Sequence, residues 1–332
     1  MHGFLHDTLG ELDRALAVDR VRTFLVRVFA VARTRTNLLD ADQHGPTREE
    51  ADALAAPLPA LSPRGFYWAA TRASLRFGGL LAEGVRLGHT TGFDSGSTLD
   101  YIYRNQANGR TLLGRIIDRT YLDAIGWRGI RQRKLDVEEL LCEGAARLRA
   151  IGAPVRLVDI AAGYGRYVLD AIAMLPERPE SALLRDYSDL NVEQGRALIR
   201  ARNLGDIAHF EEADAFDRTG LAALEPRPTL AVVSGLFELV PDNRLVRQSL
   251  AGLADAIAPG GFLVYTGQPW HPQLELIARA LTSHRQGAAW VMRRRTQEEL
   301  DQLVAAAGFR KVTQRIGESG IFTVSLAQRV AE

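Results

Sequence analysis

Two glycines that follow a short aliphatic segment are the residues of this sequence best suited to hold a cofactor. Val155 to Ile160 is rich in aliphatic side chains, which is typical of a strand buried on both faces of a parallel sheet. Gly163 and Gly165 follow at once, and a helical pattern begins at Arg166. Because glycine has no Cβ atom, the backbone here can pass close to a ligand beneath the amide groups of a helix N-terminus. The segment therefore predicts a strand–turn–helix unit that binds a cofactor.

The spacing of the small residues in this turn distinguishes between cofactors. A dinucleotide fingerprint, Gly-x-Gly-x-x-Gly, would need glycine where Ala161 and Arg166 stand. The observed order, Asp159-x-Ala161-x-Gly163-x-Gly165, resembles motif I of the class I S-adenosylmethionine-dependent methyltransferases, which is acidic-x-Gly-x-Gly-x-Gly, and it departs from that motif at Ala161. The resemblance implies S-adenosylmethionine as the cofactor, with its methionine half held by this turn.

Further cofactor-binding candidates follow along the chain in the order that this resemblance requires. Asp186, followed by Tyr187, ends a predicted strand, where a carboxylate can accept hydrogen bonds from both ribose hydroxyls. Asp214, followed by Ala215, comes after the next predicted strand. In the resembled fold an Asp at this place meets the adenine amino group, although a solvated loop acid would look the same in the sequence. Ser234 ends the fourth predicted strand and completes this set.

Three residues are candidates for the catalytic step. Ligands of parallel sheets bind outside the carboxyl ends of the strands, and Glu238 and His271 follow the fourth and fifth predicted strands. Either side chain could take a proton from an attacking oxygen or nitrogen, although His271 could equally be structural. Tyr103 is the third candidate. It follows the polar, glycine-dense segment from Gly88 to Ser97, which forms either tight turns or a lid over the pocket.

Two residues before the glycine turn complete the cofactor-binding candidates. Tyr101 carries an aromatic face, which attracts a cation such as a sulfonium, although ordinary packing is an equal explanation. Arg131 belongs to a basic cluster between Trp127 and Lys134. Such a cluster is either a solvated helix face or a binding site for a carboxylate or phosphate. No His-x-x-x-His pair or cysteine set is present, so no metal site is expected.

The elements that must position these residues change character near residue 153. Strand and helix patterns alternate after this point, and the last two strands are joined by Gly317 to Gly320, which is too short for a crossover helix. The sequence thus predicts an α/β fold with a Rossmann-like class I methyltransferase sheet, mostly parallel, with a C-terminal antiparallel hairpin and an N-terminal all-helical cap. The expected strands are 155–160, 182–185, 208–211, 230–234, 262–266, 311–316 and 321–326, and the expected helices between them are 167–175, 190–203, 244–258, 273–282 and 297–307.

The first half of the chain reads as helices and linkers. We expect N-terminal helices and a linker over 1–62, a helical cap or substrate region over 63–152 and the S-adenosylmethionine-binding domain over 153–332. Within this half, helical spacing of apolar residues occurs at 9–35, 66–87, 112–125 and 136–151. The apolar stripe of 9–35 could cover the sheet, form a homodimer contact or lie on a membrane surface.

Composition excludes several classes of function. The 332 residues include 41 basic and 40 acidic side chains, so charge gives no argument for nucleic acid as a partner. Only Lys134 and Lys311 are lysines, and the excess of arginine reflects either a GC-rich genome or dense anion recognition. Cys142 is the single cysteine, so an intrachain disulfide is impossible. Without a signal-peptide pattern or an apolar run long enough to span a bilayer, a cytoplasmic protein is expected.

A narrower resemblance rests on several segments between residues 85 and 330. They look like a bacterial family labelled "putative methyltransferase", some members of which are fused behind an α/β-hydrolase-like domain. The first 85 residues show no Gly-x-Ser-x-Gly elbow, so hydrolase activity is not expected here. The segments that carry the resemblance are Gly92 to Gly96, Tyr101 to Asn105, Trp127 to Lys134, Arg185 to Ser188 and Gly267 to Pro272.

The function that these features predict is methyl transfer from S-adenosylmethionine to a small-molecule or lipid-like acceptor. The acceptor would attack the methyl group in line within a capped pocket, where alignment and exclusion of water matter most. Three alternatives remain open: attack on the aminocarboxypropyl chain with release of methylthioadenosine, a nicotinamide oxidoreductase, and a non-catalytic protein that binds the cofactor.

Overall fold

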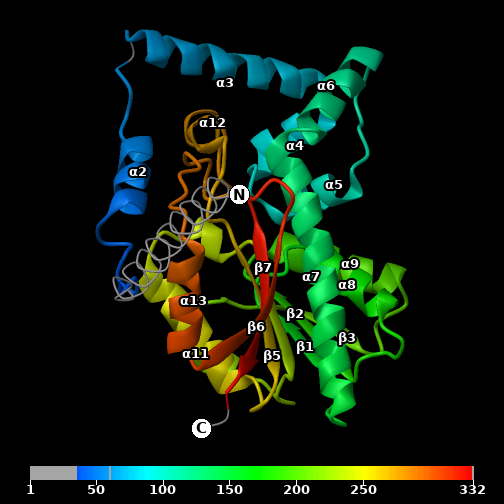
Figure 1. Ribbon diagram of the computed structural model, residues 1–332. Coiled ribbons are helices and arrows are strands. Elements are labelled where there is room, and N and C mark those ends of the chain that lie inside the picture. Colours follow the sequence, from blue (N-terminus) through cyan, green and yellow to red (C-terminus); the bar gives the residue numbers. More distant parts are fainter. Residues whose placement is uncertain (1–35, 60, 331–332) are drawn as a thin grey trace, which may run out of the picture. The chain divides into compact units, whose positions relative to one another are not determined.

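The computed structural model describes residues 36–59 and 61–330 (Figure 1). The described residues from Leu39 onward belong to one compact unit. The helices expected over 9–35 lie outside the described residues, and the division of the chain at residues 62 and 152 stays a prediction.

A seven-stranded sheet forms the centre of this unit. Its order is β3-β2-β1-β4-β5-β7-β6. The first five strands pair in parallel, and β7 pairs antiparallel with both β5 and β6. This arrangement confirms the predicted fold class, and the seven predicted strands all occur with ends shifted by a few residues. The strands are β1 (Arg156–Asp159), β2 (Ser181–Asp186), β3 (Ala208–Glu212), β4 (Leu230–Val233), β5 (Phe262–Gly267), β6 (Phe309–Ile316) and β7 (Thr323–Arg329).

Helices cover both faces of the sheet because strands buried on two sides must be packed on both. One face packs against α8 (Arg166–Met174), α9 (Asp189–Ala201) and the second half of α7 (Ile125–Ala150). The other face packs against α10 (Arg218–Ala222), α11 (Asn243–Ala256) and α13 (Gln297–Ala306). Of these helices, the short α10 was not predicted from the sequence.

The order of the strands determines where a ligand can bind. The chain runs outward from β1 to β2 and β3, then returns to place β4 on the other side of β1. The connections on either side of β1 therefore lead away from each other and leave a crevice at the carboxyl ends of β1 and β4. In open α/β sheets, ligands bind in this crevice.

A helical cap lies over the carboxyl ends of the strands (Figure 1). Its core is formed by residues such as Phe93, Ile102, Trp127, Trp290 and Phe322. The first half of α7 packs in this core, and its second half packs on the sheet. Helix α7 thus joins the cap to the sheet. The other cap helices are α3 (Pro63–Leu81), α4 (Glu83–Thr91), α5 (Gly96–Arg104), α6 (Leu112–Leu122) and α12 (Leu274–Ala280).

The cap differs from the sequence expectation in three places. One is α5, which none of the predicted helical segments covers. The helix expected over 66–87 is broken at Ala82, and its second part continues as α4 through Gly88 to Thr91, where a loop was expected. Gly88 is required within this helix because the Phe93 ring packs against it: a Cβ atom at Gly88 would lie 2.4 Å from that ring. The basic cluster and the helix expected over 136–151 form one helix, α7.

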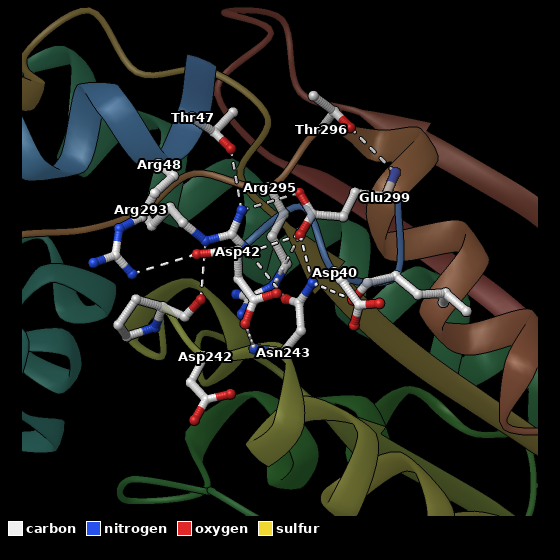
Figure 2. Close-up of polar contacts among 12 residues, drawn as sticks. Asp40, Asp42, Thr47, Arg48, Asp242, Asn243, Arg293, Arg295, Thr296 and Glu299 are labelled. Atoms are coloured by element: carbon white, nitrogen blue, oxygen red, sulfur yellow. Dashed lines mark hydrogen bonds and ion pairs between the residues drawn. The ribbon is translucent and has the colours of Figure 1, made fainter. Parts of the chain in front are cut away.

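A buried polar network attaches residues 39–55 to the sheet domain (Figure 2). Arg293 is 1% exposed and forms an ion pair with Glu299 of α13 at 2.6 Å. Asn243, which begins α11, donates from its side chain to Glu299 at 2.8 Å and from its backbone to Asp42 at 2.9 Å. Thr47 of α2 (Pro46–Ala55) bonds to Arg293 at 3.1 Å. The network therefore links three segments that are far apart in the chain.

Two helices of the described residues, α3 and α7, exceed 18 residues. Neither has a stretch long and apolar enough to cross a membrane.

Candidate functional site

The glycine turn between β1 and α8 has the geometry that the sequence predicted. Gly163 and Gly165 have φ angles of 58° and 72°, in the left-handed region that favours glycine. A Cβ atom on Gly165 would lie 2.0 Å from Leu184 Cδ2 of β2. Gly165 is the N-cap of α8. The turn thus requires glycine at position 165 for both its backbone angles and its packing.

The Asp186 carboxylate organises the loops around this turn. Its Oδ2 accepts a hydrogen bond from the Gly163 amide at 2.9 Å, and its Oδ1 accepts from the Ser188 amide and from Asn191 Nδ2, each at 3.0 Å. Burial raises the pKa of Asp186. Because one carboxylate connects the β1 and β2 loops, Asp186 holds the two loops together beside the glycine turn. Its role as the ribose ligand stays a prediction.

Asp159, at the end of β1, is a buried acid with an unused acceptor atom. The residue is 1% exposed, and its Oδ2 has no hydrogen-bond partner among the described residues. Burial raises the pKa of Asp159 to about 7, and the nearby charge of Asp186 adds to this rise. Leaving a buried polar atom without a partner costs about 1–3 kcal/mol. The donors available to this atom are the buried Tyr167 hydroxyl beside it and any ligand that binds at the turn.

The other predicted cofactor residues occupy the same edge of the sheet. Asp214 is exposed after β3, where its Oδ1 accepts from the Phe216 amide at 2.9 Å, and Ala215 is buried beside it. Ser234 follows β4, and the next residue, Gly235, turns the chain with φ 75°. Tyr187 is 60% exposed directly after Asp186.

The start of α5 covers the glycine turn. A Cβ atom on Gly163 would lie 3.5 Å from the Gly96 Cα atom. Ser97 Oγ lies 2.8 Å from the Tyr164 hydroxyl, and Arg166 Nε donates to Asp100 at 2.6 Å. The end of the polar segment from Gly88 to Ser97 therefore covers the glycine turn between β1 and α8.

Two predicted cofactor residues have their polar groups bound within the cap. The Tyr101 hydroxyl donates to the buried Asp118 carboxylate, and Arg131 Nη1 donates to the Leu122 carbonyl at 2.9 Å. None of the hydrogen bonds of these two residues reaches the glycine turn. Tyr103 lies closer to the turn, because its ring packs edge to face against Tyr167 of α8 at a centroid distance of 6.4 Å.

A cavity of about 400 Å³ lies beneath the cap and beside the turn after β4. Its walls are mostly apolar, with contributions from Ile117 of α6, Trp127 and Ile130 of α7 and Leu276 and Ile277 of α12. A few polar side chains also face it, as is usual in ligand pockets. They are Asp94, Thr120, Tyr121, Arg133, Glu238, Gln268, His271 and Gln273.

Arg133 is a site residue that our sequence analysis did not select. It is 4% exposed on α7, and its Nη1 lies 3.6 Å from Glu238 Oε1 while its guanidinium lies over the Phe322 ring at 4.8 Å. Its Nε has no hydrogen-bond partner among the described residues. The sequence contained a signal that distinguishes Arg133 from Arg131. Arg133 belongs to a stripe with helical spacing that is buried in the structure, and Arg131 lies outside this stripe. The stripe consists of positions 126, 130, 133, 137, 140 and 144.

Glu238 and His271, the catalytic candidates, are both buried in the cavity lining. Glu238 Oε1 accepts from the Thr266 hydroxyl at 2.7 Å, and its Oε2 has no partner among the described residues. His271 Nδ1 accepts from the Gln273 amide at 3.0 Å, so a neutral His271 carries its proton on Nε2. Burial lowers the pKa of His271 to about 4. Its geometry therefore favours donation of a hydrogen bond over removal of a proton.

No group of three or more His, Cys, Asp or Glu side chains among residues 36–59 and 61–330 is arranged to hold a metal ion.

The sheet order, the final antiparallel hairpin and the ligand crevice beside β1 define a Rossmann-like protein of the methyltransferase type. The chain belongs to the family described as "Putative methyltransferase", which matches residues 21–329. It is 52% identical over 328 residues to the "Uncharacterized protein YnbC" of Escherichia coli (strain K12), a match that covers 98% of this chain and 56% of that protein. The chain thus spans just over half the length of this curated relative.

Solved structures show similarity of fold. A possible exported protein from Bordetella parapertussis matches with a TM-score of 0.54 and 16% identity, over 82% of this chain and 100% of that one. The magnesium protoporphyrin IX methyltransferase ChlM from Synechocystis PCC 6803 matches with a TM-score of 0.48 and 14% identity, over 74% and 97% of the two chains.

Proposed function

We propose that this protein transfers a methyl group from S-adenosylmethionine to an apolar small-molecule or lipid-like acceptor bound in the cavity under the cap. One observation carries the proposal. Gly235 follows the predicted cofactor residue Ser234 at the carboxyl edge of β4, and it also lines the cavity. A cofactor held at this edge and an acceptor held in the cavity would therefore be neighbours.

The residues at the sheet edge suit this cofactor. Its methionine end carries an ammonium and a carboxylate, and the site offers a buried acceptor, Asp159 Oδ2, and a buried donor, Arg133 Nε, neither with a partner among the described residues. Asp186 and Asp214 stand where ribose and adenine would be held. When bound, S-adenosylmethionine supplies a methyl group on a sulfonium that is already electrophilic.

The protein's own residues would align the acceptor and exclude water. The apolar cavity walls would orient the acceptor, and the cap would close the site. Glu238 Oε2 could accept the proton of an attacking hydroxyl or amine, and His271 Nε2 could donate a hydrogen bond to the acceptor.

These two roles predict different kinetic effects. Glu238→Gln should lower kcat by about 100-fold or more, because the amide cannot take the proton. His271→Asn should have a smaller effect, about tenfold, because only one hydrogen bond is lost. Single-turnover rates with saturating cofactor measure both, and cofactor affinity should be unchanged in each variant. A larger loss in His271→Asn than in Glu238→Gln would reverse the assignment.

The raised pKa of Asp159 predicts that cofactor binding depends on pH. A cation placed beside this acid favours the carboxylate, so binding must release a proton wherever the free protein holds one. The affinity for S-adenosylmethionine should therefore rise as the pH rises toward about 7, the pKa of Asp159, and level off above it.

Titration calorimetry between about pH 6 and about pH 8, in buffers of different ionisation enthalpy, would count the released protons. Asp159→Asn is the control, because it keeps the shape of the side chain and removes the titration, and any pH dependence left in it belongs to the cofactor. Equal proton release in the variant and the natural protein would contradict this role of Asp159.

The identity of the product tests the proposed function itself. Incubation with S-adenosylmethionine and an extract of lipids and small molecules should yield S-adenosylhomocysteine and a methylated product. Methylthioadenosine in place of S-adenosylhomocysteine would show attack on the aminocarboxypropyl chain. Tight binding without any turnover would show a non-catalytic protein, and binding of NAD(P) without binding of S-adenosylmethionine would show an oxidoreductase.

A further inference from the structure

The cap helices α3 and α6 contact each other (Figure 1). Both helices carry exposed apolar side chains. Six large apolar side chains on these helices are between 55% and 74% exposed. We call this surface the cap face, and its residues are Phe66, Phe77 and Leu80 of α3 and Leu112, Leu113 and Ile116 of α6. A contiguous set of this kind marks an interaction site more often than a scattered one does.

The pattern of α3 shows that its outer side lacks a partner among the described residues. Its buried positions are Trp68, Gly78 and Gly79. Among its exposed positions, 66, 70, 73, 77 and 80 are Phe, Ala, Ala, Phe and Leu, spaced by three and four residues, and they form a second apolar stripe. The polar exposed residues of the helix are Arg64, Arg72, Ser74 and Arg76. A helix that packs against a protein on one side usually shows mainly polar residues on the other, whereas the exposed residues of this helix include an apolar stripe.

Apart from the buried Asp118, the charged residues within α3 and α6 are all basic, and two of them, Arg64 and Arg119, are paired with Glu275 and Asp123. Helix α3 contains three arginines and no acidic residue, and the sole acid of α6 is Asp118, which is buried and bonded to Tyr101. Arg76, Arg110 and Arg115 are exposed and form no ion pair with another described residue. Basic groups around an apolar helix face are typical of helices that lie in the interface of an anionic bilayer.

The cap face is continuous with the cavity. Ile116 is 55% exposed and also lines the cavity, and the cavity residues Leu75 and Ile117 belong to the same two helices. The cap face and the cavity thus share an apolar wall.

We propose that the cap face docks on an anionic lipid bilayer and that the cavity takes its acceptor from that bilayer. The docking surface stands on its own observations, whereas the lipid acceptor rests on the proposed function. A bilayer fits better than a protein partner, because exposed apolar residues on helices that also carry arginines without ion pairs match both the acyl region and the anionic headgroups.

Vesicle binding by the full chain tests the docking surface. The protein should sediment with vesicles of phosphatidylcholine that contain about one-third phosphatidylglycerol, and much less with pure phosphatidylcholine. The double variant Phe77→Glu/Leu113→Glu should bind about tenfold more weakly or worse, because two anchors are replaced by charges of the same sign as the headgroups. Arg76→Gln/Arg115→Gln should weaken binding about fivefold for each arginine removed, the change that about 1 kcal/mol per basic residue gives.

Matched controls separate this surface from general effects of charge. Ile151→Glu changes a 69% exposed residue at the end of α7, at the opposite edge of the sheet, and Arg200→Gln removes an exposed arginine of α9. Both should bind vesicles as the natural protein does. Equal binding by the cap-face variants and the controls would overturn the proposal. So would a dimer in solution that Phe77→Glu/Leu113→Glu converts to a monomer, because a second copy would then cover this face.

The outcomes distinguish this inference from the proposed function. Vesicle binding needs no cofactor, so it should persist in Asp186→Ala even when S-adenosylmethionine binding is lost. Docking with no methylated lipid in any vesicle would retain the surface and refute the lipid acceptor. Methylation of a water-soluble acceptor without vesicle binding would refute the docking and retain the function.

Discussion

Replacing Asp186 with alanine is expected to weaken binding of S-adenosylmethionine by roughly tenfold to a hundredfold or more, corresponding to about 1.5–3 kcal/mol. Hydrogen bonds to a charged group contribute this much, and here the loss has two parts. The ribose loses its acceptor, and the Gly163 amide, the Ser188 amide and Asn191 lose the carboxylate that holds the loops together. Titration calorimetry measures the affinity directly.

Asp206→Ala is a suitable control for this experiment. Asp206 also forms an ion pair, with Arg178 at 2.6 Å, but both side chains are more than half exposed and lie away from the carboxyl ends of the strands. The Asp206→Ala variant should bind S-adenosylmethionine with the affinity of the natural protein. If Asp186→Ala remains folded by circular dichroism and binds with natural affinity, the cofactor must lie elsewhere.

Replacing Glu299 with alanine is expected to lower the free energy of unfolding by about 3–5 kcal/mol. The variant leaves Arg293, whose side chain is 0% exposed, as a buried cation without its carboxylate. It also removes an acceptor from Asn243, which holds Asp42. Urea unfolding followed by circular dichroism, with the natural protein measured in parallel, gives the difference.

The exposed pair of Arg218 and Asp255 provides the comparison. Their atoms are 2.7 Å apart, much as in the buried pair, but both side chains are in contact with water. Asp255→Ala should change stability by at most about 1 kcal/mol. A double variant, Arg293→Met/Glu299→Met, should recover part of the loss, since Arg293 is no longer a buried cation without its carboxylate. The recovery should be incomplete, because the buried Arg295, whose Nε lies 3.9 Å from Glu299, still loses this partner. If Glu299→Ala and Asp255→Ala lower the free energy of unfolding equally, burial does not explain the stability that the Arg293–Glu299 pair provides.

The local signals in the sequence predicted which residues follow the carboxyl ends of the strands, where we propose that the cofactor binds. Aliphatic strands followed by glycine or acid residues placed Asp159, Gly163, Asp186 and Ser234 at strand ends, and the parallel sheet brings such ends to one edge. The same reasoning was weaker for the cap. Helical spacing found most of its helices, but a glycine-dense segment was interpreted as a loop or lid. Its Gly92 packs against the backbone of a distant segment, where a Cβ atom would lie 2.2 Å from the His284 nitrogen, and the sequence does not show this contact.

The polar residues of the cavity show most clearly what residue types alone cannot predict. Arg131 and Arg133 are two positions apart in one basic cluster, and their types do not distinguish them. Their positions on α7 distinguish the two arginines, because Arg133 faces Glu238 and Arg131 faces the Leu122 carbonyl. Likewise, only the hydrogen bond from the Gln273 amide shows that His271 keeps its proton on the nitrogen available to the cavity.

The sequence by itself thus determined the class of fold, the glycine turn and the strand-end acids, because these depend on periodicity and on residues adjacent in the chain. Tertiary structure alone decided which buried groups lack partners, that the turn after β4 also lines the cavity, and that α3 and α6 present an apolar face. The physical reason is that burial and pairing depend on atoms brought together from distant segments, and α3 is apolar on both sides, so its sequence does not reveal which side is covered.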